Sequence, residues 1–265
     1  MRTTKTTTQD SIMAHVSFTE IEESTPSKST AVAVVPVEKA IVAHAAPLGD
    51  ASKGLIGEWT SEDTKLPRIS LVNKSGELAD QFTPGTWVLE RSHQLTKLVD
   101  KSIGGPLKVT ALRMLKQYKE NITFDDQKNG THVNIFNSAS EVTASGGRVS
   151  RERGSGNYSE IAHIELLVLA PEDLEEEASA LFYNEAGDKR YARVIYTTSS
   201  TAYGQVAVPL ASSLRGHLSS TGLQGGVWEL GSKLTSNTKN SWWSPSIKSA
   251  GLVDAETAAL ISTLA

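Results

Sequence analysis

The order of strand-like and helix-like segments constrains this chain more than any other feature of its sequence. From residue 106 onward, several short strand-like segments precede one helical segment, and two strands and a last helix follow. The expected strands span residues 106–114, 132–136, 161–170, 180–184, 190–197, 227–235 and 241–248, and the expected helices span residues 203–218 and the segment after Asp254. Enzymes of the α/β class alternate strands and helices, so this order argues against them.

Several of these segments carry a clear local signal. IAHIELLVLA (161–170) is the most apolar run, and Gly187 can supply the positive φ of a hairpin that joins residues 180–184 to 190–197. Apolar side chains recur at helical spacing at Tyr203, Val206, Leu210, Leu214 and Leu218. Pro209 either kinks this helix or belongs to its first turn. Asp254 is a typical N-cap for the final helix.

The segment PLKVTALRMLKQYKENITF, which begins at Pro106, is compatible with both strand and helix. Its Ala, Leu, Met, Lys and Gln residues favour a helix. Its alternating apolar and polar residues, Pro106 after two glycines, and the pair Val109-Thr110 favour a strand. We therefore expect a strand through about Met114.

Several strands, one helix and two further strands are typical of an OB-type Greek-key barrel, whose helix lies between its third and fourth strands. The predicted fold is mainly β with few helices: an OB-like barrel over about residues 106–250, extra N-terminal strands at 68–73 and 86–90, and a C-terminal helix. Residues 1–50 are expected to be a disordered tail, in which residues 32–37 form a candidate edge strand. Residues 51–265 are expected to form a single β-rich domain, folded from near Gly54.

Composition excludes several classes of protein. The 265 residues include no cysteine, which rules out disulfides and thiolate metal sites. No apolar run approaches the ~20 residues that cross a bilayer, and the first residues lack the apolar segment of a secretory signal. We expect a cytoplasmic protein with no membrane partner. The formal net charge of −4 shows no global basic footprint, although bases gather in several segments.

The stretch KLTSNTKNSWWSPSIKS (233–249) carries the clearest functional signal. In an OB-like barrel, the loop that joins the last two strands is a binding loop for oligonucleotides. Neighbouring residues of a strand point to opposite faces, so one of Trp242 and Trp243 should enter the core and the other should face outward. An outward indole beside lysines suits the stacking of unpaired bases. The candidate nucleic-acid-binding residues of this stretch are Lys233, Asn237, Lys239, Asn240, Trp242, Trp243 and Lys248.

The alternative is that the two indoles straddle the sheet, with one in the core and one under the C-terminal helix. Two other segments mix bases with aromatic residues and extend the candidate site. They contribute Arg113, Lys116, Tyr118, Lys119, Tyr191, Arg193 and Tyr196. For the first four, a solvated edge strand is the competing interpretation, because lysines discourage strands from pairing edge to edge. Arg148, Arg151 and Arg153 form a weaker candidate in a glycine-rich loop.

Catalytic motifs are absent from the sequence. The six histidines are scattered, and no zinc-protease, nucleophile-elbow, Walker or dinucleotide-binding pattern occurs. The acids between Glu172 and Glu177 lack the spacing of a calcium loop, so a solvated turn or the start of a short helix is expected there. The sequence therefore predicts no enzyme, no catalytic residue, no metal site and no cofactor.

LPRISLVNKSGELADQFTPGTWVLE, followed by PLKVTALRMLKQYKEN, resembles phage- and prophage-encoded proteins that lie near replication or recombination genes. The resemblance covers about residues 55–120, with a weaker similarity at NSWWSP. In the order of strands and helix, the chain is also similar to phage single-stranded-DNA-binding proteins of the OB type. It ends in ISTLA instead of their acidic tail, which argues against recruitment of partners through that tail.

These observations predict a non-catalytic phage protein that binds single-stranded DNA with low sequence specificity during replication or recombination, in the cytoplasm of the host cell. Replication or recombination proteins and further copies of the chain are additional candidate partners. The alternative is a structural or decoration protein of the virion, or a protein–protein interaction module. Salt-sensitive binding of a DNA strand distinguishes the two.

Overall fold

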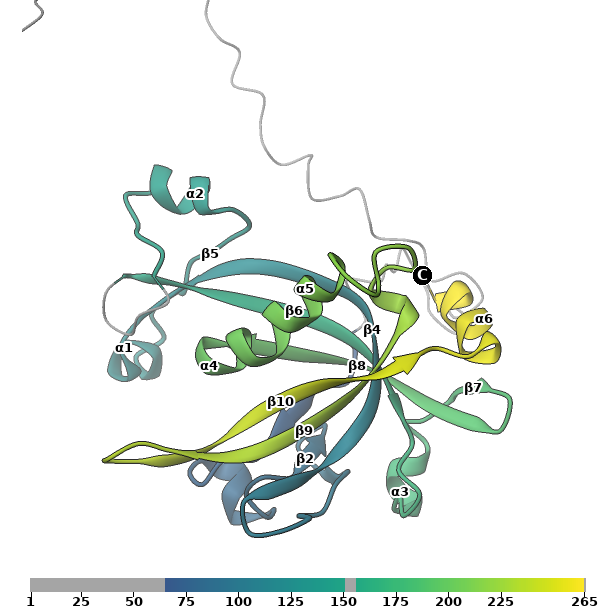
Figure 1. Cartoon of the computed structure of the whole chain (residues 1–265). Helices are drawn as coiled ribbons and strands as arrows, with labels where there is room; N and C mark the ends of the chain where they lie inside the picture. The colour runs from purple at the N-terminus through teal and green to yellow at the C-terminus, as the bar shows by residue number, and fades with distance from the viewer. Residues whose placement is uncertain (1–64, 151–155, 265) are drawn as a thin grey trace, which may run out of the picture. The chain divides into compact units, whose positions relative to one another are not determined.

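The structure, a computed structural model, describes residues 65–150 and 156–264 (Figure 1). The expected tail, the candidate strand at 32–37, the start of the fold near Gly54, and Arg151 and Arg153 lie outside the described residues. The strands are β1 (Ile69–Leu71), β2 (Trp87–Leu89), β3 (His93–Gln94), β4 (Ile103–Glu120), β5 (Ile135–Phe136), β6 (Tyr158–Leu169), β7 (Asn184–Ala186), β8 (Lys189–Ser199), β9 (Gly226–Ser236) and β10 (Ser241–Leu252). The helical segments are η4 (Glu77–Asp80), α1 (Phe124–Lys128), α2 (Ala139–Ala144), α3 (Glu176–Ser179), α4 (Ser200–Ala202), η5 (Tyr203–Ala207), α5 (Val208–Ser213), η6 (Leu223–Gly225) and α6 (Ala255–Leu264).

The prediction of a mainly β fold with few helices is confirmed, but the closed barrel is not. The described strands form two open antiparallel sheets, one with the order β1-β2-β3 and one with the order β10-β9-β4-β6-β8-β7, in which β5 also pairs with β4. Residues 103–109 of β4 pair with β9, and residues 109–120 pair with β6. One long strand therefore joins two halves of the sheet, and β10 and β7 stay as its edges.

The strand interpretation of the segment after Pro106 is confirmed, and the strand continues to Glu120. Between Val109 and Leu112, every side chain is buried, because this part of β4 is covered on both faces. Such a run has no polar face and so lacks the period of an amphipathic helix. The ladder with β6 is irregular between Ala111 and Arg113, where an extra residue interrupts the pairing.

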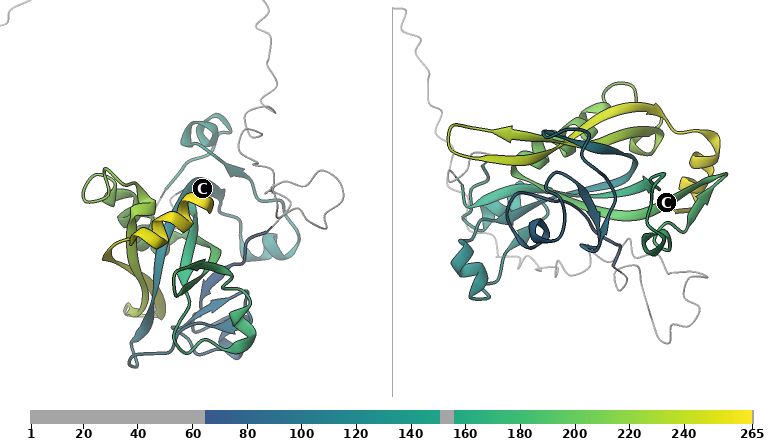
Figure 2. Two further views of the ribbon diagram at one scale, coloured as in Figure 1. Left: turned by 90° about the vertical axis from the view of Figure 1, so that its right-hand side faces the viewer. Right: turned by 90° about the horizontal axis from the view of Figure 1, so that it is seen from below.

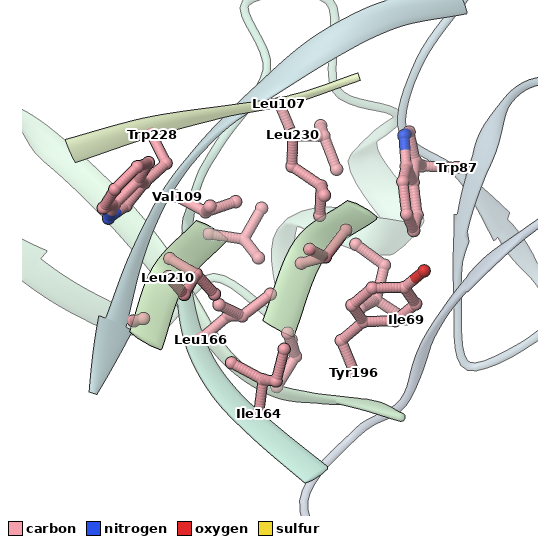
Figure 3. Close-up of a cluster of buried hydrophobic side chains, with 14 of the residues drawn as sticks. Ile69, Trp87, Leu107, Val109, Ile164, Leu166, Tyr196, Leu210, Trp228 and Leu230 are labelled. Carbon is pink, nitrogen blue, oxygen red and sulfur yellow. The ribbon is translucent and has the colours of Figure 1, made fainter. Parts of the chain in front are cut away.

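The main core lies on one face of the seven-stranded sheet, which we call the inner face. It carries Val109, Ile164, Val194 and Leu230, together with other buried side chains of β4, β6, β8 and β9 (Figure 3). The three-stranded sheet covers part of this face, and the ring of Trp87 meets Tyr196 edge-on with centroids 5.2 Å apart.

The helical segment between β8 and β9 covers another part of the inner face and lies across β6 and β8 (Figure 1). It is helical over Ser200–Ser213, shorter than the predicted 203–218, and it contains the π-helical turn η5. Pro209 lies in the first turn of α5, directly after η5. Its missing N–H is consistent with the interruption of the regular helical hydrogen bonding at this point.

The predicted hairpin around Gly187 forms with different bounds. The strand expected at residues 180–184 is instead β7 (Asn184–Ala186), and only Gly187 and Asp188 separate it from β8. Gly187 has the expected positive φ of 60°. Phe182 is buried in the main core, so the segment before β7 packs inward and does not pair with β8.

The opposite face of the large sheet, the outer face, is partly covered by α6. Leu112, Leu167 and Tyr191 pack there against Ile261. The predicted N-cap is present: Thr257 N–H donates to Asp254 Oδ1 over 2.8 Å, and Lys189 Nζ donates to Asp254 Oδ2 over 2.6 Å. These contacts attach the start of α6 to β8.

Replacing Asp254 with alanine should lower the free energy of unfolding by about 1 kcal/mol, the usual cost of a lost N-cap. The hydrogen bond from Lys189, and then those from Thr257, hold the pKa of Asp254 below its usual value. A carboxylate with a lowered pKa in the folded state stabilises the protein fully above about pH 4 and loses this effect as the pH falls further. Urea unfolding should give a lower free energy of unfolding for Asp254→Ala than for wild type near neutral pH, and the gap between the two proteins should narrow in acid. Glu172→Ala, which changes an exposed loop acid, is the control, and an equal loss for both variants would contradict the capping role.

None of the helices in residues 65–150 and 156–264 is long and apolar enough to cross a membrane.

Candidate nucleic-acid interface

The predicted final hairpin is confirmed, and its turn lies at the end of β9 and β10 opposite to α6 (Figures 1 and 2). Asn237 organises this turn: its Oδ1 accepts from Lys239 N over 3.0 Å and from Asn240 N over 2.7 Å. Asn237 is exposed, as a binding residue must be, but its side chain also stabilises the turn. The side chains of Lys239 and Asn240 are exposed at the tip.

The two tryptophans of β10 lie on opposite faces of the hairpin. Trp243 is 4% exposed and pairs with Leu234 on the inner face, whereas Trp242 is half-buried and pairs with Thr235 on the outer face. The ring of Trp243 packs against Gly85, where an added Cβ would lie 2.6 Å from the indole. Burial of Trp243 excludes it from base stacking, so Trp242 is the remaining candidate of the pair.

The free side of β10 is protected against pairing with a further strand. In an antiparallel edge strand, every second residue turns its N–H away from the partner strand. Trp243 is such a residue, and its N–H donates to Asn73 Oδ1 over 3.0 Å. The next is Pro245, which has no N–H.

The outer face of the hairpin collects several of the predicted residues. Along β10 it carries Trp242, Ser244, Ser246 and Lys248, which pair with Thr235, Lys233, Gly231 and Glu229 of β9. Ile103 and Lys108 of β4 pair with Lys233 and Glu229 and so extend two of these pairs into cross-strand rows of three residues. Glu229 therefore lies between Lys108 and Lys248 in one cross-strand row. Lys233 is exposed and lies beside Ile103. It is two residues before Thr235, which pairs with Trp242.

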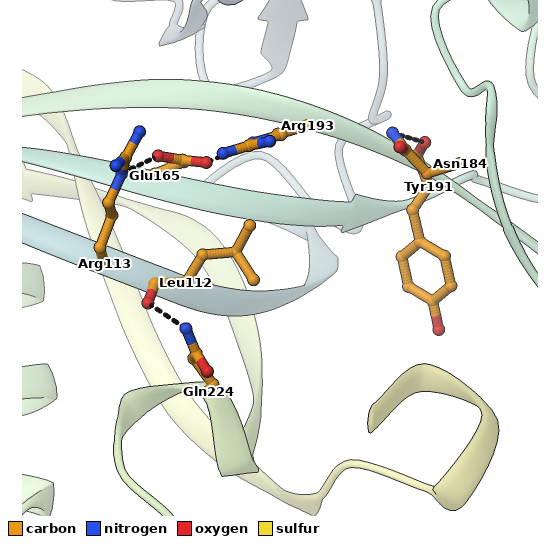
Figure 4. Close-up of polar contacts among 7 residues, drawn as sticks. All are labelled: Leu112, Arg113, Glu165, Asn184, Tyr191, Arg193 and Gln224. Atoms are coloured by element: carbon orange, nitrogen blue, oxygen red, sulfur yellow. Dashed lines mark hydrogen bonds and ion pairs between the residues drawn. The ribbon is translucent and has the colours of Figure 1, made fainter. Parts of the chain in front are cut away.

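Arg113 and Arg193 meet on one carboxylate further along the outer face. Each donates through Nε to a different oxygen of Glu165, which is 4% exposed (Figure 4). The side chain of Arg113 is 66% exposed and that of Arg193 is 24% exposed. Two guanidinium groups share one negative charge, so the cluster keeps a net positive charge at the surface. The sequence predicts both arginines, but not that Glu165 brings them together.

The three predicted tyrosines, like Trp243, are buried and cannot stack on bases. Tyr196 lies in the main core. Tyr191 packs under α6, where its hydroxyl lies 3.0 Å from Thr257 Oγ1. Tyr118 packs with Val142 and Tyr158. Their aromatic rings face elements that are distant in sequence, which alternation along one strand does not reveal.

Lys116 lies on the inner face, away from the hairpin. Its Nζ donates to Glu160 Oε1 over 2.5 Å and lies 5.1 Å from the centre of the Tyr118 ring. Burial disfavours the charged form of Lys116, but hydrogen bonds with Glu160 and Tyr118 outweigh it and raise its pKa above the usual value. Lys116 is therefore held in an ion pair with Glu160. Lys119 is half-buried near the far end of β4.

Two cavities adjoin the large sheet. The larger, of about 780 Å³, is lined by residues 94–99, 105–108 and 169–173 and by none of the predicted residues. The smaller, of about 420 Å³, lies beside β10 and is lined by both tryptophans. Among the described residues, no group of three or more His, Asp or Glu side chains could hold a metal ion.

Sequence reasoning missed residues that reach the hairpin from the three-stranded sheet. Lys74 Nζ donates to Ser241 Oγ over 2.6 Å, which places a further cation beside the start of β10. Asn73 binds the backbone of Trp243, and Arg68 lines the smaller cavity. The hydrogen bonds of Lys74 and Asn73 join residues more than 160 positions apart. The only signal in the sequence was the Arg and Lys content of the segment around β1.

In comparisons with family models, curated proteins and solved structures, no match to this chain was found.

Proposed function

We propose that this chain is a non-catalytic protein that binds single-stranded DNA with little sequence preference. The observation that carries the proposal is the position of Trp242, half-buried on the face of the β9–β10 hairpin that also presents Lys233. An indole on such a surface can stack on a base of any identity, and each stacked base contributes ~1–3 kcal/mol.

Cations around Trp242 are placed to follow the phosphates. Lys233 and Lys239 are exposed on the hairpin, Lys74 reaches Ser241 from the segment after β1, and Lys248 lies further along the outer face. The Arg113–Glu165–Arg193 cluster adds a net positive charge on the same face of β4. A local basic surface of this kind supports strand binding although the whole chain carries a net charge of −4.

The role in phage replication or recombination rests on the resemblance of residues 55–120 and is part of the proposal. A protein that covers single-stranded DNA in these processes must bind any sequence and needs no catalytic activity. Neutral hydroxyl and amide groups beside an indole, with lysines around them, fit that requirement.

A titration of labelled oligo-dT tests the function. Four phosphate contacts predict a slope of about −3 in log affinity against log salt, so a rise from about 50 to about 200 mM should weaken binding roughly 50-fold. Tryptophan fluorescence should be quenched in the same titration. A duplex of equal length is the control and should bind more weakly. Lack of retardation at low salt, together with recovery of the chain in purified particles, would favour the virion alternative.

A further inference from the structure

The smaller cavity lies at the edge of β10, between β1, the end of β8 and α4. Its volume of about 420 Å³ lies within the range of small-molecule sites. Trp242 and Trp243 line one side, and Ser199, Ser200 and Thr201 line another. The cavity thus combines aromatic and hydroxyl groups directly beside the proposed strand-binding face.

Ser244, which also lines this cavity, has an unsatisfied hydroxyl group. The residue is 1% exposed, and its Oγ has no hydrogen-bond partner among residues 65–150 and 156–264. Burial of a hydroxyl without a partner costs free energy, so native proteins keep few such groups. A polar atom of a bound ligand could supply the missing partner.

The backbone on the hydroxyl-lined side is strained. Ser200 has a φ of 48°, in the left-handed region that residues other than glycine rarely adopt. Ser199 precedes α4 but makes no capping hydrogen bond with its side chain. Strained residues of this kind are concentrated at ligand sites, where the surrounding structure holds them in place.

Arg68 supplies a positive charge at the same cavity. It is exposed, and its backbone is fixed by a bridge to Ile195 and by its N–H, which donates to Glu90 Oε1 over 2.5 Å. An aromatic wall, hydroxyl groups that both donate and accept, and a guanidinium together suit a flat polar ring attached to an anionic backbone.

We propose that this cavity receives one unpaired base of the bound strand, which inserts beside Trp242 with its polar edge toward the hydroxyl groups and its phosphate near Arg68. This inference rests on the proposed function and adds a defined base site to it. Hydroxyl groups can match the donors and acceptors of any base, in keeping with low sequence preference.

Two variants separate the cavity from the rest of the surface. Thr201→Trp places a large ring at an exposed position that lines the cavity, and Ala211→Trp places the same ring at an exposed position of α5 outside it. Each is titrated with oligo-dT and with an abasic strand of the same length. Wild type should prefer oligo-dT by roughly tenfold or more, and Thr201→Trp should reduce this preference several-fold while Ala211→Trp keeps it.

Ser244→Ala provides a readout that a purely structural role would not give. Removal of an unsatisfied buried hydroxyl should leave the unfolding midpoint in urea unchanged or raise it. The same change should weaken binding of oligo-dT several-fold and leave binding of the abasic strand unchanged.

The outcomes distinguish the two proposals. If Thr201→Trp and Ser244→Ala bind oligo-dT as wild type does, the base site is overturned and strand binding stands. If wild type binds oligo-dT and the abasic strand equally, the base site is overturned together with base stacking on Trp242, and only phosphate contacts by the lysines are left. If wild type binds neither strand at low salt, both proposals are overturned.

Discussion

Replacing Trp243 with alanine should lower the free energy of unfolding by about 3–5 kcal/mol, the usual cost of truncating a buried aromatic residue. The indole is 4% exposed, and its main neighbour at the turn before β2 is Gly85. Gly85 has no side chain that could move into the space left by the ring, and its φ of 96° disfavours replacement by a larger residue. The cavity would therefore persist.

Urea denaturation followed by circular dichroism measures this effect. Trp242→Ala is the matched control, because it removes the same side chain from the next residue of the same strand and should cost much less. A loss below about 1 kcal/mol for Trp243→Ala would contradict the buried position of this ring.

Replacing Trp242 with alanine should weaken binding of oligo-dT by about 1–3 kcal/mol, or roughly 5- to 150-fold, while the fold survives. The expected loss comes from stacking alone, so the salt dependence of binding should stay the same. Fluorescence anisotropy of a labelled strand at several salt concentrations measures both quantities. Trp242→Phe should recover part of the affinity, because a smaller ring still offers a stacking face.

Lysine variants provide the contrast to Trp242→Ala. Lys233→Ala and Lys239→Ala should each reduce the salt slope by about 0.7, as expected for one lost phosphate contact to a single strand. Equal affinity of wild type and Trp242→Ala for oligo-dT would remove the observation on which the proposed function rests.

The elements that sequence predicts well are those with a local signal. The apolar run in β6, the β9–β10 hairpin and the Asp254 cap all form where their residues indicate. Barrel closure depends on which strands pair, and β4 pairs with β9 over one part and with β6 over another. No local pattern specifies that division, and the irregularity after Ala111 is equally invisible in the sequence.

In the candidate site, too, local sequence patterns predict which face of a strand a residue lies on but not what packs against it. Alternation places Tyr191 and Arg193 on one face, and both do lie on the outer face of β8. What covers each of them is decided elsewhere in the chain: α6 buries Tyr191, whereas Glu165 of β6 holds Arg193. Burial of a tyrosine or pairing of an arginine is therefore a tertiary property that one strand cannot reveal.

The protected edge of β10 also bears on how copies of this chain can associate. An incoming strand needs free amide groups along the edge that it joins. At Trp243 the amide is already engaged by Asn73, and at Pro245 there is none. Polymerisation by sheet extension is blocked along this stretch, so any ordered array of these molecules must be built through side-chain contacts or through another margin of the protein.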